Sequence, residues 1–485
     1  MSAMKKEREV LEKNMGQGAI WAVAVGSIIG WGCFVQGANW TENAGGPAPV
    51  FAGLVVGGLL MMIIGLSYSY MIAKLPVAGG EFAYAYKGFG GVAAYICGWM
   101  LSLGYLAIVA LNATALPLLA NFIFPRALKF GYLWNIAGYD IYMGECLLSL
   151  SAILIFGILN YRGVKQVGNA QLLIVVILCV SVIACVAGVI ATGNFHVENL
   201  QPASGYKEVS FFAGFIAVVS MAPWLYVGFD CIPQAAEEYN FPPEKSKKLL
   251  LTAIVSGMLL YCAMVLVTNV VIPWTEVKSL VGADGQVVSW FSGAVLEIAM
   301  GKIGIVVIAI AVIMGILSGI NGFYLSSSRL IFSMARAKML PKWFGKIHPK
   351  YRTPSNCILV IMLVCMICPF FGREVINWVV DMCSVGTSVG YFFTCAGAIV
   401  VLKMAKSGKD KVKLNPIVAY AGALIAVIIL ALLLLPFSPA FMSLPSFIAL
   451  GIWILLGALF FLKSYSRFSK LSKEEADYAV LGDEE

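Results

Sequence analysis

The sequence has few charged residues and lacks several motifs that define well-known protein classes. Asp, Glu, Lys and Arg make up only 12% of its 485 residues, whereas soluble globular domains contain about 25%. No GxxxxGK[ST] phosphate loop occurs, which argues against an ATP-driven pump on this chain. No helix-length run is rich in arginine, which argues against a voltage sensor. The chain also has no compact basic domain, so nucleic acid is not expected as a partner.

Histidine is scarce, and cysteine forms no metal-type pattern. The two histidines, His196 and His348, fall in separate loops, so neither a histidine-based metal cluster nor a catalytic triad assembles from them. The twelve cysteines are scattered mostly through apolar segments and are interpreted as small core residues. We therefore expect no catalytic residues, no metal site and no cofactor, and a protein that is not an enzyme.

Long apolar runs dominate the chain instead. Hydrophobic residues make up 60% of the sequence and the mean hydropathy is +0.89, which is typical of an integral membrane protein. A bilayer core requires about 20 apolar residues per helix. The first run is longer than a signal-peptide core and lacks a small-residue cleavage pattern, so it is interpreted as a transmembrane helix. Twelve runs are candidates, at residues 17–41, 46–73, 90–121, 144–161, 168–191, 210–237, 248–272, 303–328, 355–371, 374–402, 415–436 and 442–462.

The distribution of basic residues predicts the orientation. With both termini in the cytoplasm, the cytoplasmic segments contain 27 of the 33 Lys and Arg residues, in agreement with the positive-inside rule. A miscounted helix would invert every later loop, so this split supports an even number of helices. We expect a multi-pass protein of the cell (inner) membrane. The six residues expected outside are Arg126, Lys129, Lys207, Lys278, Lys302 and Arg373.

The first apolar run contains a cluster of glycines where a helix would be expected to break. In GSIIGWG, residues 26–32, glycines flank two β-branched isoleucines, and glycine is a poor helix former. A membrane helix is interrupted only where its freed backbone groups line a cavity or find protein partners. The alternative interpretation is close helix packing, since small residues allow neighbouring helices to approach.

A second break is predicted in the sixth run. Residues 221–233, MAPWLYVGFDCIP, hold two prolines, a glycine and Asp230 in apolar surroundings, and a carboxylate at that depth usually faces a cavity or a partner. Interruptions in the first and sixth helices suggest two inverted repeats of five helices each. The expected organisation is a cytoplasmic tail (1–16), a first repeat (17–191), a second repeat (210–402), two further helices (415–462) and a cytoplasmic tail (463–485).

The two breaks offer backbone groups of opposite polarity. The amides of Gly30, Trp31 and Gly32 are expected at the amino end of the outer half-helix, where partial positive charge favours a carboxylate. Carbonyls before the first break and in the sixth helix suit an ammonium group; these are expected at Gly26, Ile28, Trp224, Leu225 and Val227. A zwitterionic α-amino acid matches both ends.

At these residues the sequence resembles the amino acid-polyamine-organocation (APC) superfamily of permeases, and the resemblance covers nearly the whole chain. It is carried by the motifs at 26–32 (GSIIGWG), 75–90 (LPVAGGEFAYAYKGFG), 228–238 (GFDCIPQAAEE) and 318–341 (SGINGFYLSSSRLIFSMARAKMLP). The resemblance implies an all-α membrane protein with the leucine-transporter-type fold and two C-terminal helices added. It also implies that Ile28, Trp31 and Gly32 contact the substrate backbone, while Trp224 and Val227 supply carbonyls and a gate.

Departures from the family pattern bear on coupling and specificity. Leu178 stands where some proton-coupled members have a lysine in the fifth helix, and Gly104 precedes Tyr105 where some cationic-amino-acid members have a glutamate. A sodium site in this fold would need oxygens from helices one and eight; Ser318 and Asn321 are near it. H⁺ and Na⁺ coupling therefore both stay open. Trp31 replaces a small residue and either shrinks the pocket or acts as a lid.

The remaining polar residues have competing interpretations. Asp230 is a proton-binding group, a partner for a substrate cation, or a structural acceptor for freed amides. Glu237 and Glu238 are interpreted as a solvated helix end at the cytoplasmic mouth, with a gate to Lys or Arg as the alternative. Arg329 is expected to snorkel to the inner interface, and Glu81 is expected to pair within the amphipathic loop. Further pocket candidates on helices three and ten are Tyr105, Asn112, Ser384 and Thr387.

The predicted function is secondary transport of amino acids by alternating access, with substrate at the unwound centres of helices one and six. The alternatives are a polyamine or organic-amine permease and an amino-acid exchanger of the same fold; a transport-dead sensor, a channel or a membrane enzyme is less well supported. The expected partners are an amino acid and the lipid bilayer. The predicted substrate-binding residues are Gly26, Ser27, Ile28, Gly30, Trp31, Gly32, Tyr105, Trp224, Leu225, Val227, Phe229, Asp230, Asn321, Ser384 and Thr387.

Overall fold

The computed structural model describes residues 9–124, 126–136, 138–281, 288, 290–404, 412–438 and 441–482. The outermost parts of both expected tails, residues 1–8 and 483–485, lie outside this range. The α-helices are Gln17–Ile28 (α2), Gly32–Val35 (α3), Gly37–Asn43 (α4), Pro47–Lys74 (α5), Gly80–Phe89 (α6), Gly91–Ile123 (α7), Met143–Arg162 (α8), Val164–Ala191 (α9), Phe211–Ser220 (α10), Ala222–Tyr226 (α11), Cys231–Gln234 (α12), Ser246–Val270 (α13), Phe291–Met300 (α14), Lys302–Arg336 (α15), Ser355–Ile367 (α16), Gly372–Met404 (α17), Pro416–Leu434 (α18), Leu444–Phe468 (α19) and Lys473–Leu481 (α20).

Short 3₁₀-helices and one small hairpin complete the secondary structure. The 3₁₀-helices are Val197–Leu200 (η1), Tyr206–Glu208 (η2), Ala236–Glu238 (η3), Pro243–Lys245 (η4), Trp274–Ser279 (η5), Lys342–Gly345 (η6) and Cys368–Phe371 (η7). Strands Tyr132–Ile136 (β1) and Tyr139–Tyr142 (β2) pair antiparallel. Among the described residues, the regular structure is thus helical apart from this hairpin and an isolated β-bridge between Met15 and Tyr239. The hairpin was not predicted from the sequence.

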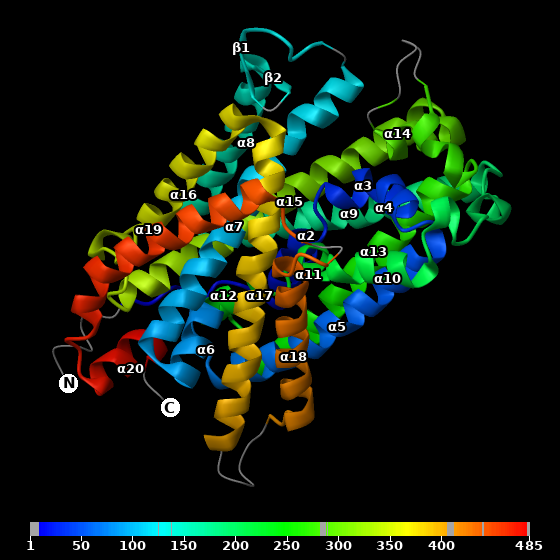
Figure 1. Cartoon of the computed structure of the whole chain (residues 1–485). Coiled ribbons are helices and arrows are strands. Elements are labelled where there is room, and N and C mark those ends of the chain that lie inside the picture. Colours follow the sequence, from blue (N-terminus) through cyan, green and yellow to red (C-terminus); the bar gives the residue numbers. More distant parts are fainter. Residues whose placement is uncertain are drawn as a thin grey trace.

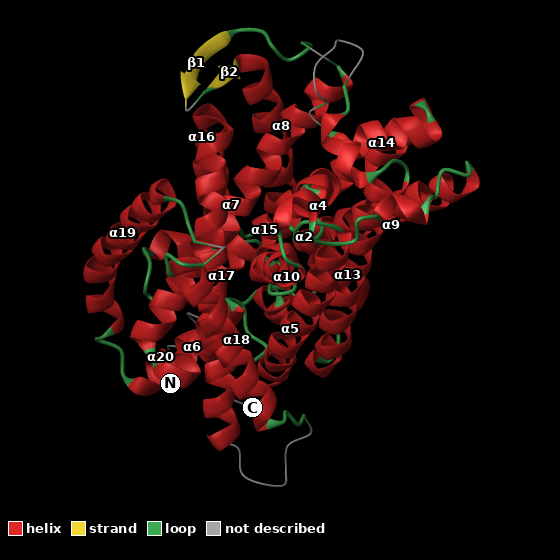
Figure 2. Ribbon diagram, turned by 45° about the vertical axis from the view of Figure 1, so that its right-hand side comes forward, coloured by secondary structure: helices red, strands yellow, loops and turns green. Residues whose placement is uncertain are grey.

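The long helices form a bundle whose two ends differ (Figure 1). The first and last described parts of the chain lie at one end of the bundle, together with α6 and α20, and the β1–β2 hairpin lies at the other. We call these the terminal end and the hairpin end (Figure 2). Helix α7 lies in the middle of the bundle, where it packs against α15 on one side and α17 on another.

Nine helices of the described residues are long and apolar enough to cross a membrane, and together they make this a multi-pass membrane protein. Three more of the predicted runs are shorter or broken. The run 355–371 folds as α16 followed by η7, the run 17–41 as α2, α3 and part of α4, and the run 210–237 as α10, α11, α12 and part of η3. Two features differ from expectation: α14 is an additional helix, and α15 continues to Arg336, beyond the predicted end at residue 328.

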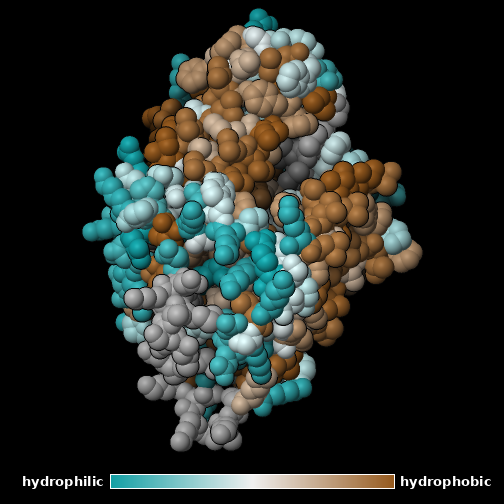
Figure 3. Space-filling model, turned by 90° about the vertical axis from the view of Figure 1, so that its left-hand side faces the viewer, coloured by the Kyte–Doolittle hydropathy of each residue, from teal (hydrophilic) through white to brown (hydrophobic). Residues whose placement is uncertain are grey.

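The outer surface of the bundle is apolar where lipid would contact it. On α9, exposed side chains include Leu173, Val180 and Ile183, and on α19 they include Leu455 and Leu462. Figure 3 shows hydrophobic side chains over the upper part and the right-hand flank of one face, with hydrophilic ones gathered below. A contiguous exposed apolar surface of this extent is typical of a membrane protein.

Helix α19 is attached to α7 by two tryptophans that bond each other's backbone. The indole nitrogen of Trp99 donates to the Trp453 carbonyl at 3.0 Å, and that of Trp453 donates to the Trp99 carbonyl at 3.1 Å. Their rings stack with centroids 4.6 Å apart. Gly457 lies against this pair, and a Cβ atom there would stand 2.3 Å from the Trp99 indole nitrogen.

We predict that Gly457→Val destabilises the protein by about 1–3 kcal/mol, because overpacking this contact forces α19 away from Trp99. The measurement is thermal unfolding of the purified chain in detergent. Gly451→Val is the matched control on the same helix, since a Cβ atom at Gly451 meets nothing within 4 Å. Equal melting temperatures for the two variants would show that the tryptophan pair does not hold α19.

Candidate functional site

The first broken helix opens between α2 and α3. Helix α2 ends at Ile28, and Ile29 leaves the helical region with φ −93° and ψ 90°. Helix α3 starts only at Gly32. Within the part of the chain that the structure describes, the amide nitrogens of Gly30 and Gly32 donate no hydrogen bond. Gly32 is buried and Gly30 is half-buried, and a backbone donor removed from water is costly unless another group reaches it.

The second broken helix opens between α11 and α12. Val227 leaves the helix with φ −54° and ψ 133°, and Gly228 has φ +131°, a conformation that other residues rarely adopt. The Gly228 amide donates to Asp230 Oδ1 at 2.6 Å. Asp230 thus acts as a structural acceptor for an amide freed by the break, one of the roles expected for it.

The two breaks touch each other. A Cβ atom at Gly228 would lie 2.5 Å from the amide nitrogen of Ile28 and 2.6 Å from the carbonyl carbon of Ser27. Only glycine allows this approach of backbone to backbone. The interruptions therefore form one site, although 200 residues separate Ile28 from Gly228 in the sequence.

The predicted acceptor carbonyls differ in how they are used. The Gly26 carbonyl accepts the Ser318 hydroxyl at 2.8 Å and the Ile28 carbonyl accepts the Tyr261 hydroxyl at 3.0 Å, so neither is free as expected. Each keeps a second lone pair. By contrast, among the described residues the carbonyls at 224, 225 and 227 accept no hydrogen bond outside their own short helix.

A small cavity of about 30 Å³ lies beside the two breaks. This is roughly the volume that one water molecule occupies in the liquid (~30 Å³), so the cavity as it stands is too small for an amino acid. Seven of the fifteen predicted binding residues line it. The lining residues are Ser27, Ile28, Gly30, Trp31, Gly32, Ile108, Leu111, Asn112, Trp224, Val227 and Tyr261.

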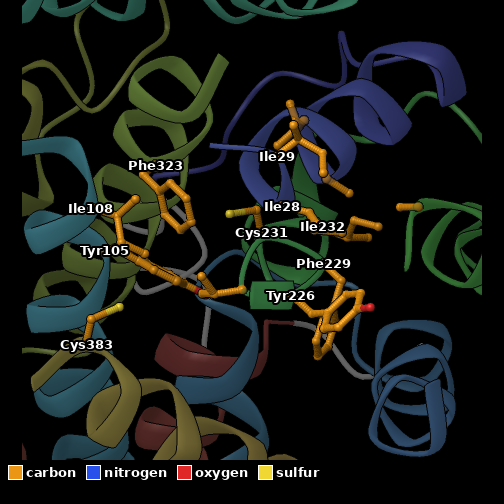
Figure 4. Close-up of a cluster of buried hydrophobic side chains, with 14 of the residues drawn as sticks. Ile28, Ile29, Tyr105, Ile108, Tyr226, Phe229, Cys231, Ile232, Phe323 and Cys383 are labelled. Carbon is orange, nitrogen blue, oxygen red and sulfur yellow. The ribbon is translucent and has the colours of Figure 1, made fainter. Parts of the chain in front are cut away.

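The other eight predicted residues do not line this cavity. The hydroxyl of Tyr105 is 3.0 Å from Asp230 Oδ2 and 3.1 Å from the Asp230 carbonyl oxygen. Figure 4 shows three aromatic side chains near Ile28 and the break that follows α11: Tyr105 of α7, Phe323 of α15, and Phe229, which lies in the break itself. The remaining ones are buried in their own helices or packing: Gly26, Leu225, Asn321, Ser384 and Thr387.

Three lining residues were not predicted. Ile108 and Leu111 are ordinary apolar residues of α7, and Tyr261 lies in the middle of α13. No local pattern distinguishes them from core residues. Asn112 was named as a pocket candidate, and it does line the cavity; its Oδ1 has no hydrogen-bond partner among the described residues.

A larger hollow lies on the hairpin side of the cavity. It measures about 240 Å³ and includes Trp31, Val35, Asn121, Lys129 and Trp290 in its lining. Trp31 lines both this hollow and the small cavity and is 7% exposed. Its indole therefore stands between the two spaces, in the position of a lid.

The terminal side of the site is closed by two buried ion pairs. Glu238 and Arg329 are both fully buried and joined at 3.0 Å, and Glu237 pairs with Arg336 at 2.9 Å. The expectations of a solvated helix end and of a snorkelling Arg329 are both wrong, because α15 extends past the expected membrane boundary and packs over η3. The pairing with arginine is the one that the alternative interpretation expected.

The N-terminal segment adds to this closure. The Leu11 amide donates to Glu237 Oε1 at 3.1 Å, and Arg336 donates to the Glu9 carbonyl at 3.0 Å. A hollow of about 610 Å³ at the terminal end shares no lining residue with the small cavity. The small cavity is thus separated from the hollow at the terminal end, whereas it shares Trp31 with the hollow on the hairpin side.

A multi-pass helical protein with two interrupted helices beside one small cavity is typical of membrane transporters of small solutes. Comparison with known families agrees with this class. Residues 16–460 match the family described as amino acid permease, and the chain belongs to that family. This membership agrees with the resemblance to APC superfamily permeases.

Three proteins similar to this chain along most of its length are transporters. The methylthioribose transporter of Bacillus subtilis (strain 168) is 24% identical over 485 residues, covering 98% of this chain and 97% of the relative. The branched-chain amino acid permease BcaP of Lactococcus lactis subsp. cremoris (strain MG1363) is 26% identical, covering 80% and 81%. The glutamate/serine transporter AimA of Bacillus subtilis (strain 168) is 26% identical, covering 82% and 72%.

We predict that Arg329→Met lowers the free energy of unfolding by about 3–5 kcal/mol, because it leaves the Glu238 carboxylate buried without its cation. The double variant Glu238→Gln with Arg329→Met should recover most of that loss, since neither residue then carries a charge. The measurement is a double-mutant cycle of thermal unfolding. Glu198→Gln, which alters the exposed pair of Glu198 with His196, serves as the control and should change little.

If the single and double variants were equally unstable, the loss would arise from packing around Arg329, and the ion pair would not be the source of stability.

Proposed function

We propose that this permease is a secondary transporter that carries amino acids across the cell membrane by alternating access. The observation that carries the proposal is the contact between the two broken helices at Gly228 and Ile28. It leaves donors at Gly30 and Gly32 and acceptors at Trp224 and Val227 around one space. These groups match the carboxylate and the ammonium of an α-amino acid.

The proposed substrate-binding residues are those predicted from the sequence, with Ile108, Leu111, Asn112 and Tyr261 added from the cavity lining. The lining of the small cavity contains no acidic or basic side chain. A neutral amino acid with an apolar side chain fits these surroundings, whereas a polyamine would bring cations without a carboxylate partner there. This favours amino acids over the alternative of an organic-amine substrate.

The conformation of the structure, in which the small cavity is closed on both sides, corresponds to the occluded step of an alternating-access transport cycle. The ion pairs of Glu237 and Glu238 close the terminal end, and Trp31 separates the site from the outer hollow. Substrate entry requires the cavity to enlarge, and the Trp31 and Trp224 side chains are the large groups on its wall. We propose that Trp31 is the outer lid and that the ion pairs are the inner gate.

We further propose twelve membrane crossings with both termini in the cytoplasm. The nine long helices supply nine, and the segments α2–α4, α10–α12 and α16–η7 supply three. The terminal end is then cytoplasmic. The two interrupted segments occupy corresponding positions, first and sixth, which supports two inverted repeats at 17–191 and 210–402 followed by a helix pair at 415–462.

A second candidate substrate class comes from one relative. The methylthioribose transporter matches this chain along almost its full length, and its named substrate is a neutral solute without carboxylate or ammonium groups. Such a solute would use the hydroxyl of Ser27 and the amide of Asn112 more than the backbone groups of the breaks.

The test of function is uptake by proteoliposomes that contain the purified chain. We expect counterflow of a uniformly ¹⁴C-labelled mixture of the twenty amino acids, competed best by leucine, isoleucine or another apolar member. Competition by putrescine alone would favour the amine alternative, and counterflow of methylthioribose alone would favour the sugar. No counterflow of any of the three would overturn the transporter proposal.

For the site itself, we predict that Gly32→Ala abolishes counterflow while the protein stays folded. A Cβ atom at Gly32 would stand 2.7 Å from the Trp224 ring, so the ring must move into the cavity. Gly37→Ala is the matched control in the same segment, because its Cβ atom meets only ordinary contacts, the nearest at 3.6 Å. Counterflow by Gly32→Ala at the rate of the control would place the substrate elsewhere.

Coupling to sodium is disfavoured by a chain of neutral amides. Asn160 donates to Asn321 Oδ1 at 3.0 Å, and Asn321 donates to Gln171 Oε1 at 2.8 Å. The Gln171 amide then donates to the carbonyls of Ala22 and Ser318, both at 3.2 Å. These two carbonyls belong to α2 and α15, the helices from which a sodium site of this fold would take its oxygens. An amide group already fills the space between them.

We therefore predict that replacing sodium by choline leaves uptake of the amino-acid mixture unchanged. Gln171→Glu should make uptake depend on an added cation, because a buried carboxylate facing two carbonyl oxygens requires one. Gln166→Glu, an exposed position on the same helix, is the control. A loss of wild-type uptake in choline would show that sodium binds despite Gln171.

A further inference from the structure

A buried carboxyl group outside the candidate membrane spans has no role in the site described so far. Glu81 lies in the first turn of α6, the short helix between α5 and α7, and its side chain is fully buried. The sequence analysis placed Glu81 in an amphipathic loop where it would pair. No ion pair of the described residues includes it, because the nearby buried arginines are already joined to Glu238 and Glu237.

The two oxygens of Glu81 have different surroundings. Oε2 accepts a short hydrogen bond from the side-chain amide of Gln234 in α12. Oε1 is buried and accepts no hydrogen bond from any described residue. One carboxyl oxygen is thus held by the broken sixth segment, and the other is able to carry a proton.

Asp230, the other buried carboxyl nearby, is different. Its Oδ1 accepts the Gly228 amide and its Oδ2 accepts the Tyr105 hydroxyl, so both oxygens have donors that stabilise the charge. Glu81 accepts the Gln234 amide and is favoured in its charged form by the Tyr68 and Tyr105 hydroxyls, but burial and the neighbouring Asp230 carboxylate act against its charge more strongly. Of the two, Glu81 is therefore the group for which ionisation is the more costly.

The titratable groups of the described residues that interact with Glu81 lie on five helices and at the break before α12, and none of them is a cation; α15 and α20, which also pack against α6, contribute none. Burial, and next the Asp230 charge, raise the pKa of the Glu81 carboxyl well above its usual range, while the Tyr68 and Tyr105 hydroxyls oppose the shift. The titratable groups that interact with it are Tyr68 of α5, Tyr84 of α6, Cys97 and Tyr105 of α7, Asp230, Cys231 of α12 and Tyr391 of α17.

The segment around Glu81 also contacts the part of the chain that follows the second break. Gln234 follows the break by only a few residues, and a Cβ atom at Gly80 would stand 2.7 Å from the Pro233 side chain. Tyr105 contacts Asp230 and interacts with Glu81 as well. A movement of α12 away from α6 would therefore break the bond to Gln234 and open a path from Glu81 to the cytoplasm.

We propose that Glu81 is a proton-binding site that couples amino-acid uptake to H⁺ entry. A proton from the outer solution binds Oε1 of the carboxylate and gives a neutral carboxyl group while α12 rests on α6. When α12 moves, the carboxyl releases the same proton to cytoplasmic water. Because an ionised Glu81 adds a second negative charge beside Asp230, it favours the separated state. This inference rests on the proposed transport function.

The experiment uses proteoliposomes of the full chain with a pH-sensitive dye in the lumen. Adding the ¹⁴C-labelled mixture of twenty amino acids outside should acidify the lumen, and an acidic outer solution should accelerate uptake. In Glu81→Gln, we expect acidification and the effect of the pH gradient to be lost while counterflow continues, since exchange of one amino acid for another needs no net proton movement.

Two further variants serve as controls. Glu81→Asp keeps a titratable carboxyl and should retain acidification. Glu145→Gln alters a carboxyl on α8 near the hairpin end that is bonded to Asn121, and it should behave as the wild type. Wild-type counterflow without acidification, or acidification that persists in Glu81→Gln, would overturn the inference and leave the transporter proposal intact.

Loss of counterflow in both Glu81 variants would mean that the residue is structural, which also overturns the inference. Absence of counterflow in the wild type would instead overturn the proposed function.

Discussion

The structure depends on the contact between two interrupted membrane helices, at which protein groups bind the backbone amides and carbonyls that the interruptions free. Lipid offers no hydrogen bonds, so a broken helix is stable only if protein groups meet the freed amides and carbonyls. Here the Gly228 backbone lies directly against the backbone of Ser27 and Ile28, and Asp230 and Tyr261 supply an acceptor and a donor at the two breaks. The groups that remain without partners face one small cavity. The site therefore exists because the contact between the two breaks leaves some of the freed backbone groups without hydrogen-bond partners.

The polar interactions around that contact are of two kinds: a chain of neutral amides, and charged or titratable groups on the terminal side. The amide chain from Asn160 through Asn321 to Gln171 joins α8, α15, α9 and α2 with neutral, directional bonds. On the terminal side, charged pairs connect η3 with α15, and the single bond between Gln234 and Glu81 connects α12 with α6. Ion pairs and one hydrogen bond to a titratable group respond to water and protons more readily than a neutral amide chain does. The asymmetry suits a gate at the terminal end.

Much of the helical pattern could be predicted from the sequence, and the failures have physical causes. Long apolar runs and glycine or proline clusters are local signals, and they predicted both interrupted segments, 17–41 and 210–237. The β1–β2 hairpin was missed because it lies in a connection between helices, and α14 was missed because its ten residues, although apolar, are too few to cross a membrane. Glu237, Glu238 and Arg329 were assigned to a solvated surface because their charges resemble a helix end; only the packing of α15 over η3 shows that they are buried together.

The sequence by itself determined that the chain is a multi-pass membrane protein and where its helices break, because these follow from hydropathy and from the conformational freedom of glycine. It did not determine which backbone groups stay free, since the Gly26 and Ile28 carbonyls accept hydroxyls from distant helices. The tertiary structure alone decided which of those groups share a cavity, and that Ile108, Leu111 and Tyr261 complete its wall. It also decided that Glu81 lies in the interior beside Asp230 and Gln234. The reason is that these contacts join residues far apart in the chain, and periodicity within one helix cannot specify its neighbour.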